Sequence, residues 1–279
     1  NIVALRREIG RPFSVSIDFE GGRVQRHAGV LGARMSPREM AATMSPEQVE
    51  AYAHDLGNVL RWHGVTVDFA PVLDVDGSGL EIVGDRAFST DPVVAGEYGA
   101  AFARGLRAAN VTPVFKHFPG HGQASGDTHH MLAVTPPVEQ VIAHDLPPYA
   151  VALPQADAAV MVGHMVVPGL GDGVTPSSLD PAVYGLLRSG DYPGGQPFDG
   201  VVYTDDLTGM RAITDRYSLP QAVVAAVRAG ADRPLFSTGG GLVAAIDALD
   251  AAVGNGEISA ARLDEAAHRV QLQLLNSGT

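Results

Sequence analysis

The stretch with the most side chains able to move protons is residues 116–130, with the sequence KHFPGHGQASGDTHH. It contains four histidines, one lysine and one aspartate, and it follows an apolar run at residues 111–115. Histidine gains and loses a proton near neutral pH, and burying so many polar groups for packing alone would cost free energy. We therefore predict that this loop carries the proton-transferring half of a hydrolytic site.

Within this loop, Asp127 stands two residues before His129. Its carboxylate can accept a hydrogen bond from one ring nitrogen, which fixes the tautomer and leaves the other nitrogen as a competent proton donor or acceptor. The alternative is a turn in which Asp127 caps backbone amides and His129 faces solvent. The other proton-carrying residues around the pair favour the catalytic interpretation.

Polar side chains also follow the other segments that read as strands. No glycine cluster in the chain has dinucleotide-binding or phosphate-loop spacing, so no cofactor is expected. The neighbouring Asp205 and Asp206 fall on opposite faces of a strand, and the sequence leaves open which one faces the site. The strand-end residues are Asp18, Glu20, Arg23 and Arg26, then Asp74, then Lys116 and His117, then His164, and then Asp205 and Asp206.

These residues need a scaffold, and two sets of segments provide it. The predicted strands are residues 13–18, 65–71, 111–115, 158–164, 199–206 and 234–238. Helical periodicity and capping residues predict helices over 2–9, from Pro46, from Pro92, around 138–153, near 180–188, over 218–229, and after Ser259 to about residue 275.

Strands that alternate with helices are typical of βαβ units and a parallel sheet. Polar residues follow the strands, and in a barrel all the strand carboxyl ends converge on one face, so we predict a TIM-type (β/α)8 barrel over an open doubly wound sheet. Six strands are two short of eight, and we expect the first two upstream of Asn1. No linker divides the chain, so residues 1–279 are predicted to form one catalytic barrel domain, incomplete at its N-terminus.

Composition narrows the possible partners. The chain has 46% hydrophobic and 18% charged residues, a net charge of -12 and scattered arginines, so we expect a globular protein that does not bind nucleic acid. The absence of cysteine excludes disulfides, thiolate metal sites and a cysteine nucleophile. No apolar run is long enough to span a membrane. We expect a monomer; because the chain opens on Asn1, the compartment stays open between cytoplasm and cell wall.

Four motifs, in order along nearly the whole chain, give this sequence a family resemblance. It resembles the β-N-acetylglucosaminidases of glycoside hydrolase family 3. The resemblance implies a retaining barrel enzyme that removes terminal N-acetylglucosamine, with peptidoglycan fragments (muropeptides) as natural substrates. The motifs are DFEGGRVQR at residues 18–26, GDRAF at 84–88, KHFPGHG with the later DTH at 116–129, and TDDL at 204–207.

The resemblance also implies roles for individual residues. Asp205 would be the nucleophile, and His129, oriented by Asp127, would be the general acid and base. Phe19 stands where glutamine is common, and Thr128 replaces serine, without changing these three residues. The implied sugar-binding residues are Asp18, Arg26, Arg86, Lys116 and His117.

Three alternatives remain open. A binding protein that has lost catalysis would keep the sugar-holding residues, and a phosphorylase would use phosphate in place of water. A metal-dependent hydrolase is suggested by the number of histidines, since imidazole is a common zinc ligand, although no set has typical ligand spacing. Its ligands would be His117, His121, His129 and His164 with Asp205.

Overall fold

The computed structural model of the protein describes residues 2–77 and 79–277. The strands are β1 (Ser16–Ile17), β2 (Phe19–Gly21), β3 (Val24–Gln25), β4 (Val67–Asp68), β5 (Thr112–Phe118), β6 (Ala159–Val162) and β7 (Val202–Thr204). The helices are α1 (Ile2–Ile9), α2 (Ala28–Leu31), α3 (Pro37–Thr43), α4 (Pro46–Trp62), α5 (Pro92–Ala108), α6 (Val138–His144), α7 (Pro147–Ala152), α8 (Pro181–Ser189), α9 (Arg211–Thr214), α10 (Leu219–Ala229), α11 (Leu242–Gly254) and α12 (Ala260–Asn276). Short 3-10 helices are η1 (Gly84–Arg86), η2 (Leu153–Gln155) and η3 (Ser177–Leu179).

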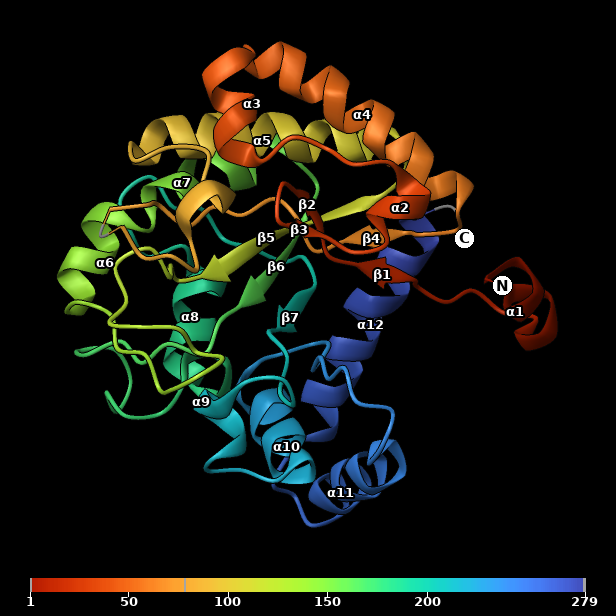
Figure 1. Ribbon diagram of the computed structural model, residues 1–279. Helices are drawn as coiled ribbons and strands as arrows, with labels where there is room; N and C mark the ends of the chain where they lie inside the picture. Colours follow the sequence, from red (N-terminus) through yellow and green to blue (C-terminus); the bar gives the residue numbers. More distant parts are fainter. Residues whose placement is uncertain (1, 78, 278–279) are drawn as a thin grey trace.

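Five strands form one parallel sheet in the order β1-β4-β5-β6-β7. Sheet order follows chain order, and helices connect the strands on the outside, so the strand direction turns steadily from β1 to β7 in Figure 1. The prediction of an α/β fold with a parallel sheet is confirmed, while the closed eight-stranded barrel stays a prediction.

The predicted sixth strand, residues 234–238, is not a strand. The segment begins beside β7, where Tyr203 and Arg233 form an isolated parallel bridge. Pro234 has no backbone N–H to continue the ladder, and the Leu235 N–H bonds to the Thr204 hydroxyl at 2.9 Å instead of to a backbone carbonyl. The segment therefore lies where a strand would lie, but it lacks the hydrogen-bond pattern of one.

The single helix predicted around residues 138–153 is two helices. α6 ends at His144 and α7 begins at Pro147. Because a proline has no N–H to donate and disfavours the helical conformation of the residue before it, a continuous helix cannot pass through Pro147 and Pro148 without distortion.

A small hairpin, β2 and β3, lies where the sequence suggested only a polar turn. Phe19 pairs with Gln25 in antiparallel fashion. Gly21, with φ of 92°, makes the turn possible, since a Cβ there would lie 2.1 Å from the Met35 carbonyl oxygen. The hairpin holds the Glu20 side chain in the interior, where it is fully buried.

Helices cover the outside of the sheet (Figure 1). α4 begins with a capping box at Ser45 and Gln48, and it packs closely on α5. The contact depends on Gly105, where a Cβ would lie 2.2 Å from the Glu50 carbonyl oxygen. In the described part of the chain, none of the helices combines the length and apolarity needed to cross a membrane.

Candidate active site

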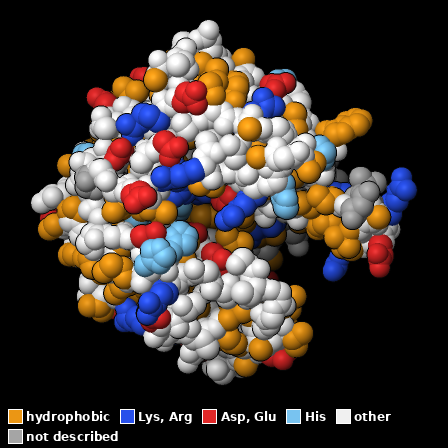
Figure 2. Space-filling view, viewed as in Figure 1, with side chains coloured by type: hydrophobic (Ala, Val, Ile, Leu, Met, Phe, Trp, Pro, Cys, Tyr) orange, Lys and Arg blue, Asp and Glu red, His pale blue; other side chains and the backbone are white. Residues whose placement is uncertain are grey.

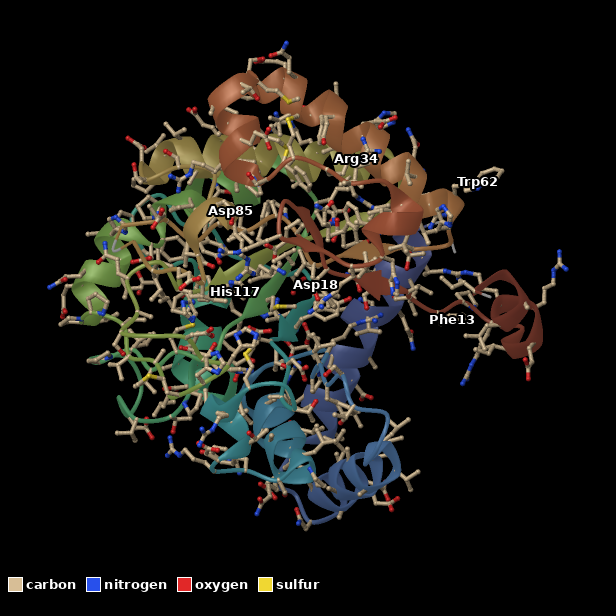
Figure 3. All side chains as sticks on the ribbon, viewed as in Figure 1. Phe13, Asp18, Arg34, Trp62, Asp85 and His117 are labelled. Atoms are coloured by element: carbon tan, nitrogen blue, oxygen red, sulfur yellow. The ribbon has the colours of Figure 1, made fainter. Side chains whose placement is uncertain are left out.

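A cleft of about 570 Å³ opens at the carboxyl ends of the parallel strands. In Figure 2 the hollow near the middle of the face is rimmed by basic, acidic and histidine side chains, and Figure 3 shows Asp18 and His117 near the same central region. Of the eight site residues predicted from the sequence, Asp127 bonds to His129 in the cleft wall. The other seven line the cleft: Asp18, Arg26, Arg86, Lys116, His117, His129 and Asp205.

The deepest group in the cleft is an ion cluster around Glu20. The Arg86 guanidinium donates to both Glu20 carboxylate oxygens, at 2.7 and 2.8 Å. The Lys116 ammonium contacts Glu20 at 2.7 Å and Asp18 at 2.9 Å. Glu20 and Lys116 are buried, whereas the Asp18 side chain keeps 38% of its surface exposed. The cluster therefore presents Asp18 to the cleft and keeps Glu20 beneath it.

Opposite charges keep this cluster ionised. Burial alone would raise the pKa of Glu20, but Lys116 and Arg86 lower that pKa to about 2. Burial would lower the pKa of Lys116, whereas Asp18 and Glu20 raise that pKa above its ordinary value. Asp68, beneath the cluster, differs because burial raises its pKa well above the usual range. Burial therefore favours the protonated form of Asp68.

A second buried pair joins Asp74 to His117. The His117 Nδ1 donates to Asp74 at 2.6 Å, and Asp74 also accepts the backbone N–H groups of His117 and His121 at 3.2 and 2.8 Å. Burial would raise the pKa of Asp74, but His117 lowers that pKa far below its ordinary value. The bond leaves the His117 Nε2 facing Asp205, 3.9 Å from its Oδ2.

Asp205 and Asp206 lie in different surroundings. Asp205 is 8% exposed and accepts one backbone hydrogen bond on Oδ1, from Asp206. Burial would raise the pKa of Asp205, but His117 and His164 lower that pKa. Asp206 instead accepts bonds on one oxygen from Thr208 and from the Ser237 N–H. Asp206 therefore connects the loop after β7 to the segment at residues 234–238 by hydrogen bonds.

The pair predicted from the sequence, Asp127 and His129, lies at the mouth of the cleft. The His129 Nδ1 donates to Asp127 at 2.6 Å, and the His129 side chain is 44% exposed. Burial would raise the pKa of Asp127, but the backbone and ring of His129 lower it. The backbone N–H groups of Arg211 and Ala212 donate to the carbonyls of residues 129 and 128, at 3.5 and 3.2 Å. This loop is therefore docked on the start of α9.

The metal-binding alternative has no ligand set in the described part of the chain. No group of three or more His, Asp or Glu residues there is arranged to hold an ion. Ring nitrogens of His117 and His129 are bonded to Asp74 and Asp127. Both ring nitrogens of His164 are occupied, by the Ser178 hydroxyl at 2.7 Å and the Asp206 carbonyl at 3.1 Å.

Another cleft, of about 450 Å³, lies at the opposite end of the strands, under α12. Its charged side chains pair with one another: Arg107 with Asp157 at 2.7 Å, and Arg269 with Asp199 at 2.6 Å. None of the eight site residues predicted from the sequence lines this cleft, so the candidate site is the one at the carboxyl ends.

Sequence reasoning noted Glu20 and Asp74 as strand-end acids but gave them no role in the site. Apart from the metal alternative it gave His121 no role, and it gave His130 none: His121 is buried in the cleft wall, and the His130 side chain is 81% exposed. Lys116 and His117 also lie inside β5, which continues to Phe118, and not in the loop after it. Because these two residues are polar, the sequence pattern placed the end of the strand too early.

Known proteins resemble this chain along most of its length. The family described as the glycosyl hydrolase family 3 N-terminal domain matches residues 2–272. Beta-hexosaminidase LpqI of Mycobacterium tuberculosis (strain ATCC 25618 / H37Rv) is 45% identical over 261 residues, which are 93% of this chain and 67% of LpqI.

Solved structures agree as well. A glycosyl hydrolase of the GH3 family from Mycobacterium smegmatis superposes with a TM-score of 0.91 at 49% identity, covering 94% of this chain and 79% of that one. A glycoside hydrolase family 3 beta-N-acetylglucosaminidase from Paenibacillus sp. str. FPU-7 superposes with a TM-score of 0.90 at 34% identity, covering 96% of this chain and 51% of that one.

Proposed function

Because the chain belongs to glycosyl hydrolase family 3, we propose that it is a retaining exo-β-N-acetylglucosaminidase that removes terminal N-acetylglucosamine from peptidoglycan fragments. One observation carries the proposal: a single cleft combines a buried aspartate, Asp205, with a histidine, His129, that a second aspartate orients. Retaining glycosidases need a nucleophile and a group that acts first as acid and then as base. The relatives' names, beta-hexosaminidase and beta-N-acetylglucosaminidase, support the choice of sugar.

In the first step, Asp205 attacks the anomeric carbon as the bond to the leaving oxygen breaks. The protonated His129 gives its Nε2 proton to that oxygen, while Asp127 holds Nδ1 and stabilises the imidazolium. The Asp205 Oδ2 suits this attack because its neighbour across the cleft, the His117 Nε2, lies 3.9 Å away, beyond hydrogen-bond distance. The product of this step is a sugar joined to Asp205 by an ester bond.

In the second step, water attacks the same carbon and the bond to Asp205 breaks. The neutral His129 accepts the proton from this water, so the ring returns to its starting state. The exposed position of His129 supports both halves, because the leaving group must depart and water must enter at the same place.

The remaining predicted residues would hold the sugar. Lys116 and Arg86 are fixed donors, and the half-exposed Asp18 is an acceptor for a hydroxyl. Arg26 is exposed at the rim and His117 lies beside Asp205. Holding a substrate in one orientation lowers the barrier by paying its entropy cost during binding.

We also propose that the chain folds as one catalytic domain with the curved parallel sheet of a TIM-type barrel and acts as a monomer on a carbohydrate substrate. The five parallel strands, and the segment after Asp232 beside β7, support a barrel. The polar groups gathered at one end of the strands support it further.

Turnover of a chromogenic N-acetylglucosaminide tests the proposal. We expect hydrolysis by the wild type and a loss of kcat on the order of 10⁴- to 10⁶-fold for Asp205→Ala. Asp206→Ala should lose much less, since Asp206 bonds to Thr208 and Ser237 and not to the reacting atoms. The reverse ranking would identify Asp206 as the nucleophile. Saturable binding without any release of the chromophore would make the protein a sugar binder.

Product analysis shows whether water or phosphate accepts the sugar from the enzyme. The substrate is a disaccharide derived from the cell wall, with and without phosphate. We expect N-acetylglucosamine and the second sugar of the disaccharide as products under both conditions, with no sugar phosphate. N-acetylglucosamine 1-phosphate in the sample with phosphate would identify a phosphorylase that uses the same covalent intermediate.

A further inference from the structure

We propose that Glu20 is a positioning residue of this site. It holds Arg86 and Lys116 in the geometry in which these two cations bind the sugar, and Glu20 itself does not contact the sugar. The inference rests on the proposed function and adds a residue to it. Glu20, Arg86 and Lys116 all border the cleft, but the Glu20 side chain is 0% exposed, whereas the Arg86 side chain keeps 11% of its surface exposed.

Glu20 orients both cations at once. Its Oε2 accepts the Arg86 Nε–H at 2.7 Å, and its Oε1 accepts an Arg86 terminal N–H at 2.8 Å and the Lys116 ammonium at 2.7 Å. Two parallel bonds between a guanidinium and a carboxylate fix the plane of the arginine as well as its position. A movement of Glu20 would therefore displace Arg86 and Lys116 together.

The cations keep donors for a ligand. Arg86 has five N–H bonds, of which two go to Glu20 and one to the Ile82 carbonyl at 3.0 Å. Lys116 has three N–H bonds, and its partners among the described residues are Glu20 and Asp18. Two donors of Arg86 and one of Lys116 thus have no partner among the described residues, and in a cleft that Asp18 also lines they suit the hydroxyl and amide groups of an amino sugar.

A matching cluster at the other end of the sheet shows what a purely structural carboxylate looks like. Asp232 is buried and binds Arg188 at 2.8 Å and Arg262 at 2.6 Å. Other donors of these arginines go to backbone carbonyls, including those of Phe198 and Ala231, and one of Arg262 goes to the Glu265 carboxylate. Neither Arg188 nor Arg262 lines the cleft at the carboxyl ends of the strands, whereas Arg86 and Lys116 both do.

Charge balance gives Glu20 a second reason to be present. Glu20 contacts both Arg86 and Lys116, and Asp18 contacts Lys116, so two negative charges face two positive ones. Without the Glu20 charge, Asp18 would be the remaining ion-pair partner of Lys116, and Arg86 and Lys116 would repel each other. We expect these two cations to move apart. The sugar would then meet donors in the wrong places.

The test compares Glu20→Gln with Asp232→Asn, two isosteric changes that each remove one buried charge. We measure the Kd of N-acetylglucosamine by calorimetry, and kcat and KM for a chromogenic N-acetylglucosaminide with a very good leaving group. Glu20→Gln should raise Kd and KM by roughly 10- to 100-fold, the scale found for partners that orient metal ligands. Asp232→Asn should lower the free energy of unfolding and leave Kd within about twofold.

Glu20→Asp keeps the charge but draws the carboxylate back by one methylene, so it serves if the glutamine variant does not fold. It should also weaken binding, because the cations must follow the carboxylate. Wild-type Kd and KM in a folded Glu20→Gln or Glu20→Asp variant would overturn the proposal, as would an equal loss of affinity in Asp232→Asn. Failure of the wild type to bind or cleave the sugar would instead reject the proposed function.

Discussion

The cleft contains two aspartate–histidine pairs with the same bond and opposite surroundings. In each, the histidine Nδ1 donates to a carboxylate at 2.6 Å. The side chains of His117 and Asp74 are only 10% and 2% exposed, whereas those of His129 and Asp127 are 44% and 25% exposed. The same pair of residue types is thus used once in the floor of the cleft and once at its mouth.

The difference in exposure indicates that the two aspartate–histidine pairs have different tasks. Asp74 also accepts the backbone N–H groups of His117 and His121, so the buried pair is fixed within the protein. His129 belongs to a loop that bonds through its backbone to the start of α9, and its ring is accessible to solvent. A fixed imidazole beside Asp205 suits holding the sugar and tuning the nucleophile, and an accessible imidazole suits proton exchange with leaving group and water.

The variant that should distinguish the two pairs by the largest change in activity is one without the His129 imidazole. His129→Ala should lower kcat by about 10²- to 10⁴-fold on a disaccharide, whose leaving oxygen needs a proton. The loss should be much smaller on an aryl substrate with a very good leaving group, which departs unprotonated. The ratio of kcat values on the two substrates measures this dependence.

His117→Ala is the matched control for that experiment. Because the buried ring is proposed to act on the sugar and not on the leaving group, its removal should lower the activity on both substrates by similar factors. A loss that depended on the leaving group in His117→Ala and not in His129→Ala would exchange the roles of the two histidines.

A smaller effect should follow when each orienting carboxylate becomes an amide. Asp127→Asn should reduce kcat roughly 10- to 100-fold on the disaccharide and less on the aryl substrate, because the imidazolium loses its counter-charge. Asp74→Asn should raise KM and lower kcat on both substrates alike, since it disturbs His117 beside Asp205. Identical leaving-group dependence in the two variants would mean that the pairs share one task.

The two pairs also show what the sequence can reveal. Asp127 and His129 are two residues apart, so their contact is local and was predicted, and the structure forms that bond. Asp74 and His117 are separated by 43 positions, and Glu20 and Arg86 by 66. Those contacts depend on strand register, for example on the bridge between Val72 and Lys116, which no local pattern encodes.

The fold divides in the same way. Alternating apolar and helical segments predicted the parallel sheet and most helices, because these signals are local. The segment after Arg233 failed as a strand, since Pro234 interrupts the ladder and the Thr204 side chain replaces a backbone acceptor. The position of Glu20 under Arg86 likewise follows from the β2–β3 hairpin, whose turn requires the close approach of Gly21 to Met35.

The smallest effect should appear in the pH dependence of stability. The pKa of Asp74 is lowered in the folded protein from an ordinary value of 3.8. A carboxyl of this kind stabilises the fold at pH values above its unfolded pKa, and that contribution is lost as the pH falls from about 5 toward the folded pKa. Asp74→Asn should therefore reduce the free energy of unfolding by about 1–2 kcal/mol at pH 7, and by progressively less below pH 5.

Urea unfolding of the wild type, Asp74→Asn and Asp127→Asn at pH 7, 5 and 3.5 measures this contrast. The pKa of Asp127 is also lowered, so its effect has the same sign, but solvent screens this exposed pair and the change should be close to the error of the measurement. If Asp127→Asn lost as much stability as Asp74→Asn, with the same pH dependence, the loop at the mouth of the cleft would be as rigidly anchored as the floor. His129 could then not be the member of the two pairs that adapts to leaving group and water.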